Sequence, residues 1–170
     1  MKLFDINIGE TFKVAGTEFI KFTEEDGKTF AVAKDSLFNS SFGNDGNLAE
    51  SKLRAKLENE LLAKIEAEVG ADNVLEFETD MTALDGTKPF SDITSKISLP
   101  TLDFYRKHRE IFGKYSIDRW WWLSTVDSES FKDIVLCVSP RGCIDNVSYF
   151  IVSGVRPILL FSSSISVSCN

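Results

Sequence analysis

Histidine, cysteine and proline are scarce in this sequence of 170 residues, which contains one histidine, three cysteines and four prolines. No stretch approaches the roughly 18 consecutive apolar residues of a membrane-spanning helix, because the most apolar tract, 155–161, contains Arg156 and Pro157. The N-terminal sequence passes from Met1-Lys2-Leu3-Phe4-Asp5 directly into a mixed polar pattern and lacks the apolar run of a secretory signal. We therefore expect no signal peptide, no membrane insertion, and a location in the cytoplasm or on a virion surface.

The three cysteines, Cys137, Cys143 and Cys169, are too few for a disulfide framework. They show no C-x-x-C spacing, and no histidine stands near them to complete a zinc site. A tight hairpin around residues 139–142 would pair Val138 with Cys143 and place Cys137 on the other face, which disfavours a bridge between those two cysteines. We expect reduced thiols and no metal site.

Catalytic patterns are missing as well. The single histidine, His108, stands between Lys107 and Arg109 in a helical pattern, with no recognisable serine or cysteine nucleophile arrangement. Neither glycine-rich phosphate loop occurs, and no EF-hand loop is present. The carboxylate clusters at 24–26 and 76–78 are typical of solvated surface. We expect a protein that is not an enzyme and that binds no cofactor.

Negative charge is in excess, since 26 acidic residues against 19 basic ones give a formal net charge of −7 and a pI near 4.8. Such a surface repels a phosphate backbone, so nucleic acid is not expected as a partner. A hydrophobic content of 43% and a charged content of 26% are typical of a globular protein. The length fits a single domain over 1–170, and no linker or repeat divides it.

Two segments have the apolar period of amphipathic helices. In residues 48–69 leucine, isoleucine and valine recur at spacings of three, four and seven, after a capping box of Asn47 and Glu50 and before a terminating Gly70. A shorter helix is predicted over 101–112, ended by Gly113.

Most of the remaining sequence predicts strands. Residues 17–22 and 28–32 form an expected hairpin around Glu25-Asp26-Gly27, and 74–78 reads as a further strand. After residue 119 short β-branched or aromatic segments predict strands at 120–123, 133–138, 143–145, 148–152 and 155–167. The fold class is therefore α+β, with an N-terminal hairpin and two helices in 1–113 and an aromatic-cored β module in 114–170. Both helices should pack on one antiparallel sheet in which the last strand is central.

Three consecutive tryptophans, Trp120, Trp121 and Trp122, form the most unusual feature. In a strand the first and third rings point to one face and the second to the other, so both faces of the strand must be packed against other residues or used for binding. A buried central strand is the structural interpretation, and a partly exposed stacking platform for a sugar or a side chain is the alternative.

Several motifs together resemble a known family. They are W-W-L-S-T at 121–125, S-P-R-G at 139–142 and G-V-R-P at 154–157, preceded by G-E-T-F at 9–12, F-G-N at 42–44 and L-P-T-L-D at 99–103. This ordered set resembles an uncharacterised bacterial and prophage domain family marked by W-W-L-[RA]-[ST] and G-V-R-P. That family is in turn similar to the C-type-lectin-like and formylglycine-generating-enzyme-like fold.

The resemblance implies structural roles for Gly154 and Arg156, and we expect Pro157 and the three tryptophans to be structural as well. Gly154 would allow a close backbone approach, and Arg156 would be buried against a carboxylate or carbonyl groups. Ser124 departs from the family pattern, where an arginine or alanine follows W-W-L. The catalytic cysteines of formylglycine-generating enzymes and the calcium motif of lectins are also missing, so no activity follows from the resemblance.

Proteins of this fold include phage receptor-binding tips and variable proteins of diversity-generating retroelements, which place variable residues between the two motifs. The corresponding candidate ligand-binding residues here are Ser124, Thr125, Asp127, Ser128, Glu129, Ser130, Asp145, Asn146, Ser148 and Tyr149. The leading hypothesis is a binding protein of phage or prophage origin that recognises a protein or a glycan through residues 124–150. The alternatives are a structural virion or assembly protein that forms homo-oligomers, an acidic inhibitor of a host protein, and a small enzyme of unrecognised class.

Overall fold

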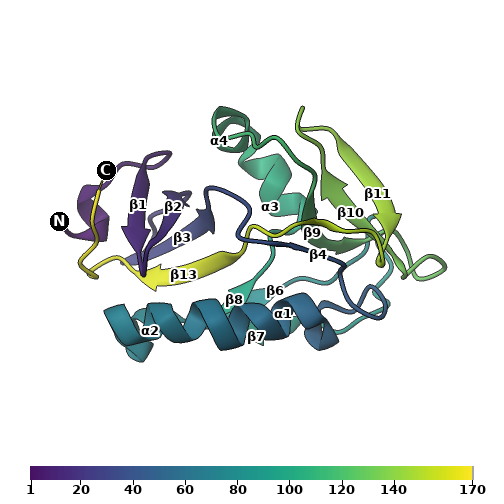
Figure 1. Ribbon diagram of the computed structural model, residues 1–170, viewed down its shortest axis with the longest axis horizontal. Coiled ribbons are helices and arrows are strands. Elements are labelled where there is room, and N and C mark those ends of the chain that lie inside the picture. Colours follow the sequence, from purple (N-terminus) through teal and green to yellow (C-terminus); the bar gives the residue numbers. More distant parts are fainter. Residues whose placement is uncertain (170) are drawn as a thin grey trace.

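The computed structural model describes residues 1–169, which form two main β-sheets and two helical segments (Figure 1). The first sheet has the order β1-β2-β3-β13-β5, and β8 also pairs with β13. Its strands are β1 (Thr11–Val14), β2 (Thr17–Lys21), β3 (Lys28–Ala33), β5 (Val74–Leu75), β8 (Ile97–Ser98) and β13 (Ile158–Ser162). The hairpin predicted around Asp26 and Gly27 is confirmed as β2–β3.

The second sheet has the order β11-β10-β9-β12-β4. Its strands are β4 (Asn39–Ser40), β9 (Trp121–Val126), β10 (Ile134–Val138), β11 (Ile144–Ser148) and β12 (Ser153–Gly154). A separate pair joins β6 (Phe77–Thr79) to β7 (Ile93–Ser95). Among the strands of residues 1–169, pairing is antiparallel except where Gly154 of β12 lies parallel to Trp121 of β9. The α+β class is confirmed, but the expectation of one sheet is wrong, because the strands divide between two main sheets and the separate pair.

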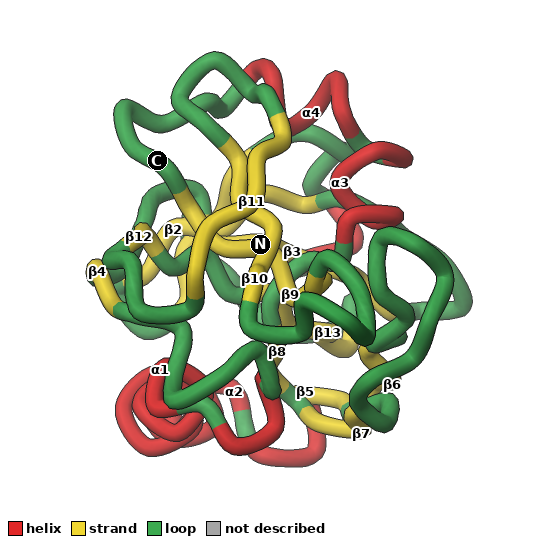
Figure 2. Tube along the Cα trace, turned by 90° about the vertical axis from the view of Figure 1, so that its right-hand side faces the viewer, coloured by secondary structure: helices red, strands yellow, loops and turns green. Residues whose placement is uncertain are grey.

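The long helical segment runs along the lower edge of the molecule in Figure 1 and is seen nearly end-on at the bottom of Figure 2. It begins with a 3₁₀ turn, η2 (Leu48–Glu50), and continues through α1 (Lys52–Lys56), the π-helical η3 (Leu57–Leu62) and α2 (Ala63–Val69). Asn47 caps the first turn as predicted, because its Oδ1 accepts a hydrogen bond from Ala49 N–H at 3.2 Å. Ser51 then caps α1, where its Oγ accepts a hydrogen bond from Arg54 N–H at 3.1 Å. Gly70 ends the segment as predicted, with a positive φ of 90°. A further 3₁₀ turn, η4 (Ala71–Asn73), leads into β5.

The second helical segment is interrupted. Thr101 caps α3 (Leu102–Lys107), α4 covers Arg109–Lys114, and His108 between them leaves helical geometry at φ −112° and ψ 27°. The sequence predicted one helix ended by Gly113, whereas the structure has two short helices, and the second continues one residue further.

The strand β9 divides the core between its two faces. Trp122 packs in one hydrophobic cluster with Phe42, Val126 and Val155, while Trp121 belongs to a second cluster with Tyr105 and Phe112. Both rings are buried, at 0% and 2% exposure, which confirms the structural interpretation for these two tryptophans. Trp120 precedes the strand and is 41% exposed.

The G-V-R-P segment crosses from the second sheet to the first. Gly154 belongs to β12, and Ile158 opens β13, which lies between β3 on one side and β5 and β8 on the other. The expectation that the last strand is central is thus confirmed. The buried Pro157 joins this segment to β3, because its carbonyl accepts a hydrogen bond from Ala33 N–H at 3.0 Å. The first residues lie beside the C-terminal segment, because Val167 N–H donates a hydrogen bond to Met1 O at 3.0 Å. The 3₁₀ turn η1 (Leu3–Asp5) lies beside the same segment, where Leu3 N–H donates to Ile165 O at 3.0 Å.

The hairpin β10–β11 differs from its prediction by one residue. Val138 pairs with Ile144 instead of Cys143. The reason is that Ser139 and Cys143 both belong to the turn, where Ser139 N–H donates a hydrogen bond to Cys143 O. All three cysteines are free thiols. The strand predicted over 148–152 is also wrong beyond Ser148, where β11 ends in a turn.

Candidate functional site

Two of the predicted ligand-binding residues lie inside the second sheet. Ser124 and Thr125 belong to β9 and are buried. Ser124 N–H donates to Pro100 O at 2.9 Å, and Thr125 Oγ1 accepts a hydrogen bond from Leu102 N–H at 3.0 Å. Their placement on a recognition loop is therefore wrong, since β9 extends to Val126 and both residues hold the start of α3.

The loop after β9 is internally bonded at its base. Ser128 is buried, where its Oγ donates to Asp127 at 3.2 Å and accepts from Phe131 N–H at 3.0 Å. Asp127 also accepts a hydrogen bond from Asn146 Nδ2 at 3.0 Å, which joins this loop to β11. Glu129 and Ser130 are exposed at the tip. Ser128 consequently has a structural role, and the free surface of this loop begins at Glu129.

The edge strand β11 carries three of the remaining predicted residues. Asp145 and Asn146 are exposed, and Ser148 is half-buried. Tyr149 is also half-buried and packs against the core, while its carbonyl accepts from Phe42 N–H at 2.7 Å. Tyr149 therefore supports the loop more than it presents a side chain to a ligand.

An apolar surface beside these residues was missed by the sequence analysis. The apolar patch comprises Phe131, Phe150, Ile151 and Val152, of which Phe131, Phe150 and Val152 are 62, 63 and 65% exposed. Phe131 and Ile151 line one shallow hollow together with Asp127 and Asn146. The run from Tyr149 to Val152 has the composition of a buried strand, so its exposure was not recognisable from the sequence.

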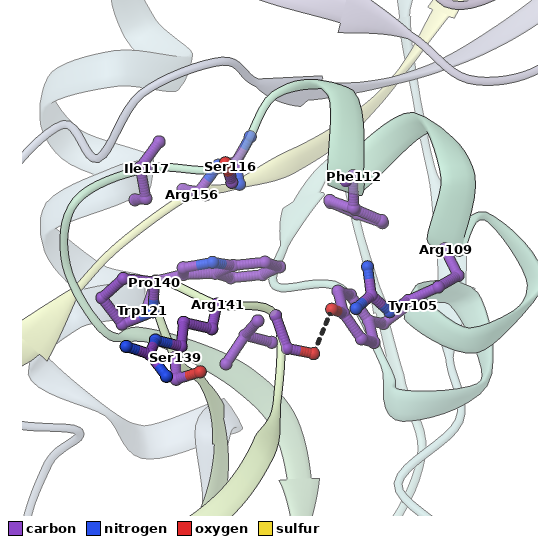
Figure 3. A pocket seen from close by; sticks show the side chains of 13 residues that line it. Tyr105, Arg109, Phe112, Ser116, Ile117, Trp121, Ser139, Pro140, Arg141 and Arg156 are labelled. Atoms are coloured by element: carbon purple, nitrogen blue, oxygen red, sulfur yellow. Dashed lines mark hydrogen bonds between the residues drawn. The ribbon is translucent and has the colours of Figure 1, made fainter.

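A second hollow, of about 300 Å³, lies between α3–α4 and the turn at 139–142 (Figure 3). We call it the arginine pocket, because Arg109, Arg141 and Arg156 line it from three different segments. Its aromatic walls are Tyr105, Phe112 and Trp121.

Arg156 is fixed firmly in this pocket. Its side chain is 0% exposed, its Nε donates to Ala33 O at 3.0 Å, and its Nη2 donates to Tyr115 O at 3.4 Å. The guanidinium carbon lies 4.8 Å from the centroid of the Trp121 ring. Burial lowers the pKa of Arg156 to about 10, and the nearby charge of Asp35 opposes that change. The group therefore remains positively charged at neutral pH.

His108 is packed among aromatic rings. Its ring centroid lies 4.4 Å from that of Phe104 and 5.5 Å from that of Phe22. Burial and the positive charge of Lys107 lower the pKa of His108. Within residues 1–169, no group of three or more histidine, cysteine or acidic side chains is arranged to hold a metal ion. No helix in that range is long and apolar enough to cross a membrane.

No family model, curated protein or solved structure matched the chain. Function is therefore inferred from the two surfaces described above, the apolar patch with its acidic neighbours and the arginine pocket.

Proposed function

We propose that this protein is a non-catalytic recognition module that binds a protein partner through the apolar patch and the exposed edge of β11. The main support for this proposal is the distribution of exposed apolar side chains. Of ten large hydrophobic residues that are exposed within residues 1–169, four belong to this patch. Isolated exposed apolar residues are ordinary, whereas a cluster rimmed by polar groups is typical of an interaction site.

The charge around the patch indicates the chemistry of the partner. Glu129 and Asp133 are exposed close to Phe131 in the chain, with the exposed Lys132 between them, and Asp127 lines the hollow of the patch. A partner that offers an apolar centre and a basic rim would match this arrangement, because complementary charges favour encounter and exclude like-charged competitors.

The edge of β11 offers a second type of contact. Within residues 1–169 this strand pairs only with β10, so its other edge is open to an added strand. Main-chain hydrogen bonds to an extended segment would supply affinity, and the neighbouring apolar side chains would supply specificity.

We also propose that the fold is C-type-lectin-like and that the protein is of phage or prophage origin. The pairing of the W-W-L strand with the G-V-R-P segment supports the fold, since Gly154 lies beside Trp121. The origin rests only on the motifs of the sequence.

The test compares two matched double variants. Phe131→Ser with Ile151→Ser alters the patch, while Phe4→Ser with Ile8→Ser removes equally exposed residues elsewhere. A partner captured with the parent protein would then be purified and titrated against all three proteins. We expect the patch variant to bind at least about thirtyfold more weakly, the scale of a lost hot spot, and the control variant to bind like the parent.

Equal binding by the patch variant and the parent would contradict the proposal. If the parent instead forms an oligomer that the patch variant dissociates, the surface serves self-assembly, and the protein is a structural component. Light scattering on each variant makes that distinction.

A further inference from the structure

We propose that the arginine pocket is a binding site for an oxyanion, a carboxylate, sulfate or phosphate group carried on a small ring or stem. This site does not depend on the proposed protein interface. It lies at the 139–142 end of the hairpin β10–β11, whereas the apolar patch lies at the other end of the same strands.

The concentration of positive charge is the first argument. The sequence contains six arginines in a chain of net charge −7, and three of them line this one hollow, which has no acidic lining residue. Within residues 1–169, Arg109, Arg141 and Arg156 form no ion pair. Arg54 and Arg106, outside the pocket, are paired with Glu58 and Asp103. None of the three guanidinium groups of the pocket is therefore paired directly with a carboxylate, and the charge of Asp35 acts on Arg156 only from beyond ion-pair distance.

Preorganisation of Arg156 is the second argument. Two carbonyl groups and the face of Trp121 hold this buried guanidinium in one orientation. A guanidinium has five N–H donors, and the two recorded bonds use only Nε and Nη2. A fixed donor group that lines a cavity binds an anion without a further loss of side-chain freedom.

The other two arginines stand at the rim of the same pocket, Arg109 on α4 and Arg141 on the turn at 139–142. Tyr105 Oη donates a hydrogen bond to Gly142 O at 2.8 Å, which ties the turn at 139–142 to α3. Arg109 lies over the Tyr105 ring at 5.5 Å and fills the space beside Gly142, where a Cβ atom would come within 2.7 Å of Arg109 Nη2. In Figure 3, Trp121 lies between Arg156 and this turn, which carries the exposed Arg141.

The size of the pocket limits the ligand. A volume of about 300 Å³ is at the lower end for small-molecule sites, which is enough for one oxyanion and a single ring. Arginine forks match planar carboxylates and tetrahedral phosphates with paired hydrogen bonds. A neutral sugar of the same shape offers no charge to the three guanidinium groups, so the anion should decide binding.

The experiment titrates the full chain with glucuronate, glucose, inorganic phosphate and sulfate, by calorimetry and by the NMR shift of the Trp121 indole. We expect saturable binding of glucuronate or of a tetrahedral anion, and none of glucose. Tighter binding of glucuronate assigns the site to a carboxylate on a ring, and tighter binding of phosphate or sulfate assigns it to a tetrahedral oxyanion.

Variants locate the binding. Arg109→Ala with Arg141→Ala changes only exposed side chains and leaves Arg156 in place, so the fold should be retained. We expect this pair to weaken anion binding at least about tenfold, and Arg106→Ala, on α3 but outside the pocket, to change it less than about twofold. The proposal is wrong if no anion binds saturably up to about 20 mM, if glucose binds equally well, or if the double variant binds like the parent.

Discussion

Arg156 carries a positive charge into the core without a carboxylate at ion-pair distance. The motif resemblance implied burial against a carboxylate or carbonyl groups, and the structure has the carbonyls of Ala33 and Tyr115 in that place. Fixed dipoles and the aromatic face of Trp121 therefore replace the water that a surface arginine would bind. Burial of the residue is confirmed, and its partners are neutral.

We expect Arg156→Ala to lower the free energy of unfolding by about 3 kcal/mol, because it removes packing and leaves two buried carbonyl groups without donors. Arg156→Lys should also destabilise, since one ammonium group cannot reproduce the guanidinium fork. Urea denaturation measures both changes. A variant as stable as the parent would show that Arg156 is not a structural residue.

Cys137 differs from the other two thiols in both burial and pKa. It is 0% exposed, and burial, with a smaller contribution from the charge of Asp145, raises the pKa of its thiol to about 12. Because the thiolate is the reactive form, native Cys137 should resist a thiol reagent at pH 8 while the exposed Cys143 and Cys169 react. Mass spectrometry after brief labelling should find two modified thiols per chain, and three in urea. Rapid native labelling of Cys137 would mean that β10 opens readily.

At the scale of elements, β9 connects the two hydrophobic clusters. Consecutive residues of a strand face opposite ways, so Trp121 and Trp122 fill different clusters, and Trp122 Nε1 donates to Ser40 O at 2.9 Å across to β4. Gly154 of β12 fits tightly beside this strand, since an added Cβ would lie 3.0 Å from Trp120 O and 2.7 Å from Ser36 Oγ. Tight backbone approach at Gly154, implied by the motif, agrees with this packing.

Substitution of a tryptophan within β9 should cost more stability than substitution of the tryptophan that precedes β9. Trp122→Ala is expected to cost about 3–5 kcal/mol of stability, because it leaves a large cavity and an unpaired carbonyl. Trp120→Ala should cost less than about 1 kcal/mol, because that ring is largely outside the core. Thermal and urea unfolding of the two variants test the contrast, and equal losses would contradict it.

At the scale of the whole molecule, each sheet is completed by a strand from the other half of the chain. β13 joins β3, β5 and β8 in the first sheet, while β4 joins β12 in the second. The sequence pattern divided the domain into residues 1–113 and 114–170. In the structure, this division separates strands that are joined by hydrogen bonds.

A fragment of residues 1–113 should not fold by itself. It lacks β13, so the edges of β3 and β5 and the apolar cluster around Phe161 would be exposed to water. We expect poorly dispersed NMR resonances from this fragment, and recovery of dispersion when the fragment 114–170 is added. A cooperative unfolding transition of 1–113 alone would instead identify it as an independent domain.

The sequence by itself determined the features that depend on neighbours in the chain. The start of the second helix at Thr101, Gly70 as a helix end and the turn at Asp26-Gly27 follow from local hydrogen bonding and from the backbone freedom of glycine. Alternating apolar residues likewise predicted β2, β3 and the buried Trp121 and Trp122, because the faces of a strand alternate in every protein.

Only the tertiary structure decided where the candidate sites lie. Ser124 and Thr125 have the composition of a polar loop, yet the pairing of β9 with β10 and the start of α3 bury them. Residues 149–152 have the composition of a strand, yet β11 ends before them, and the side chains of residues 150–152 reach the surface. The three arginines of the pocket stand at positions 109, 141 and 156 and share no motif. Their proximity arises from contacts between distant segments, which local propensity and periodicity do not encode.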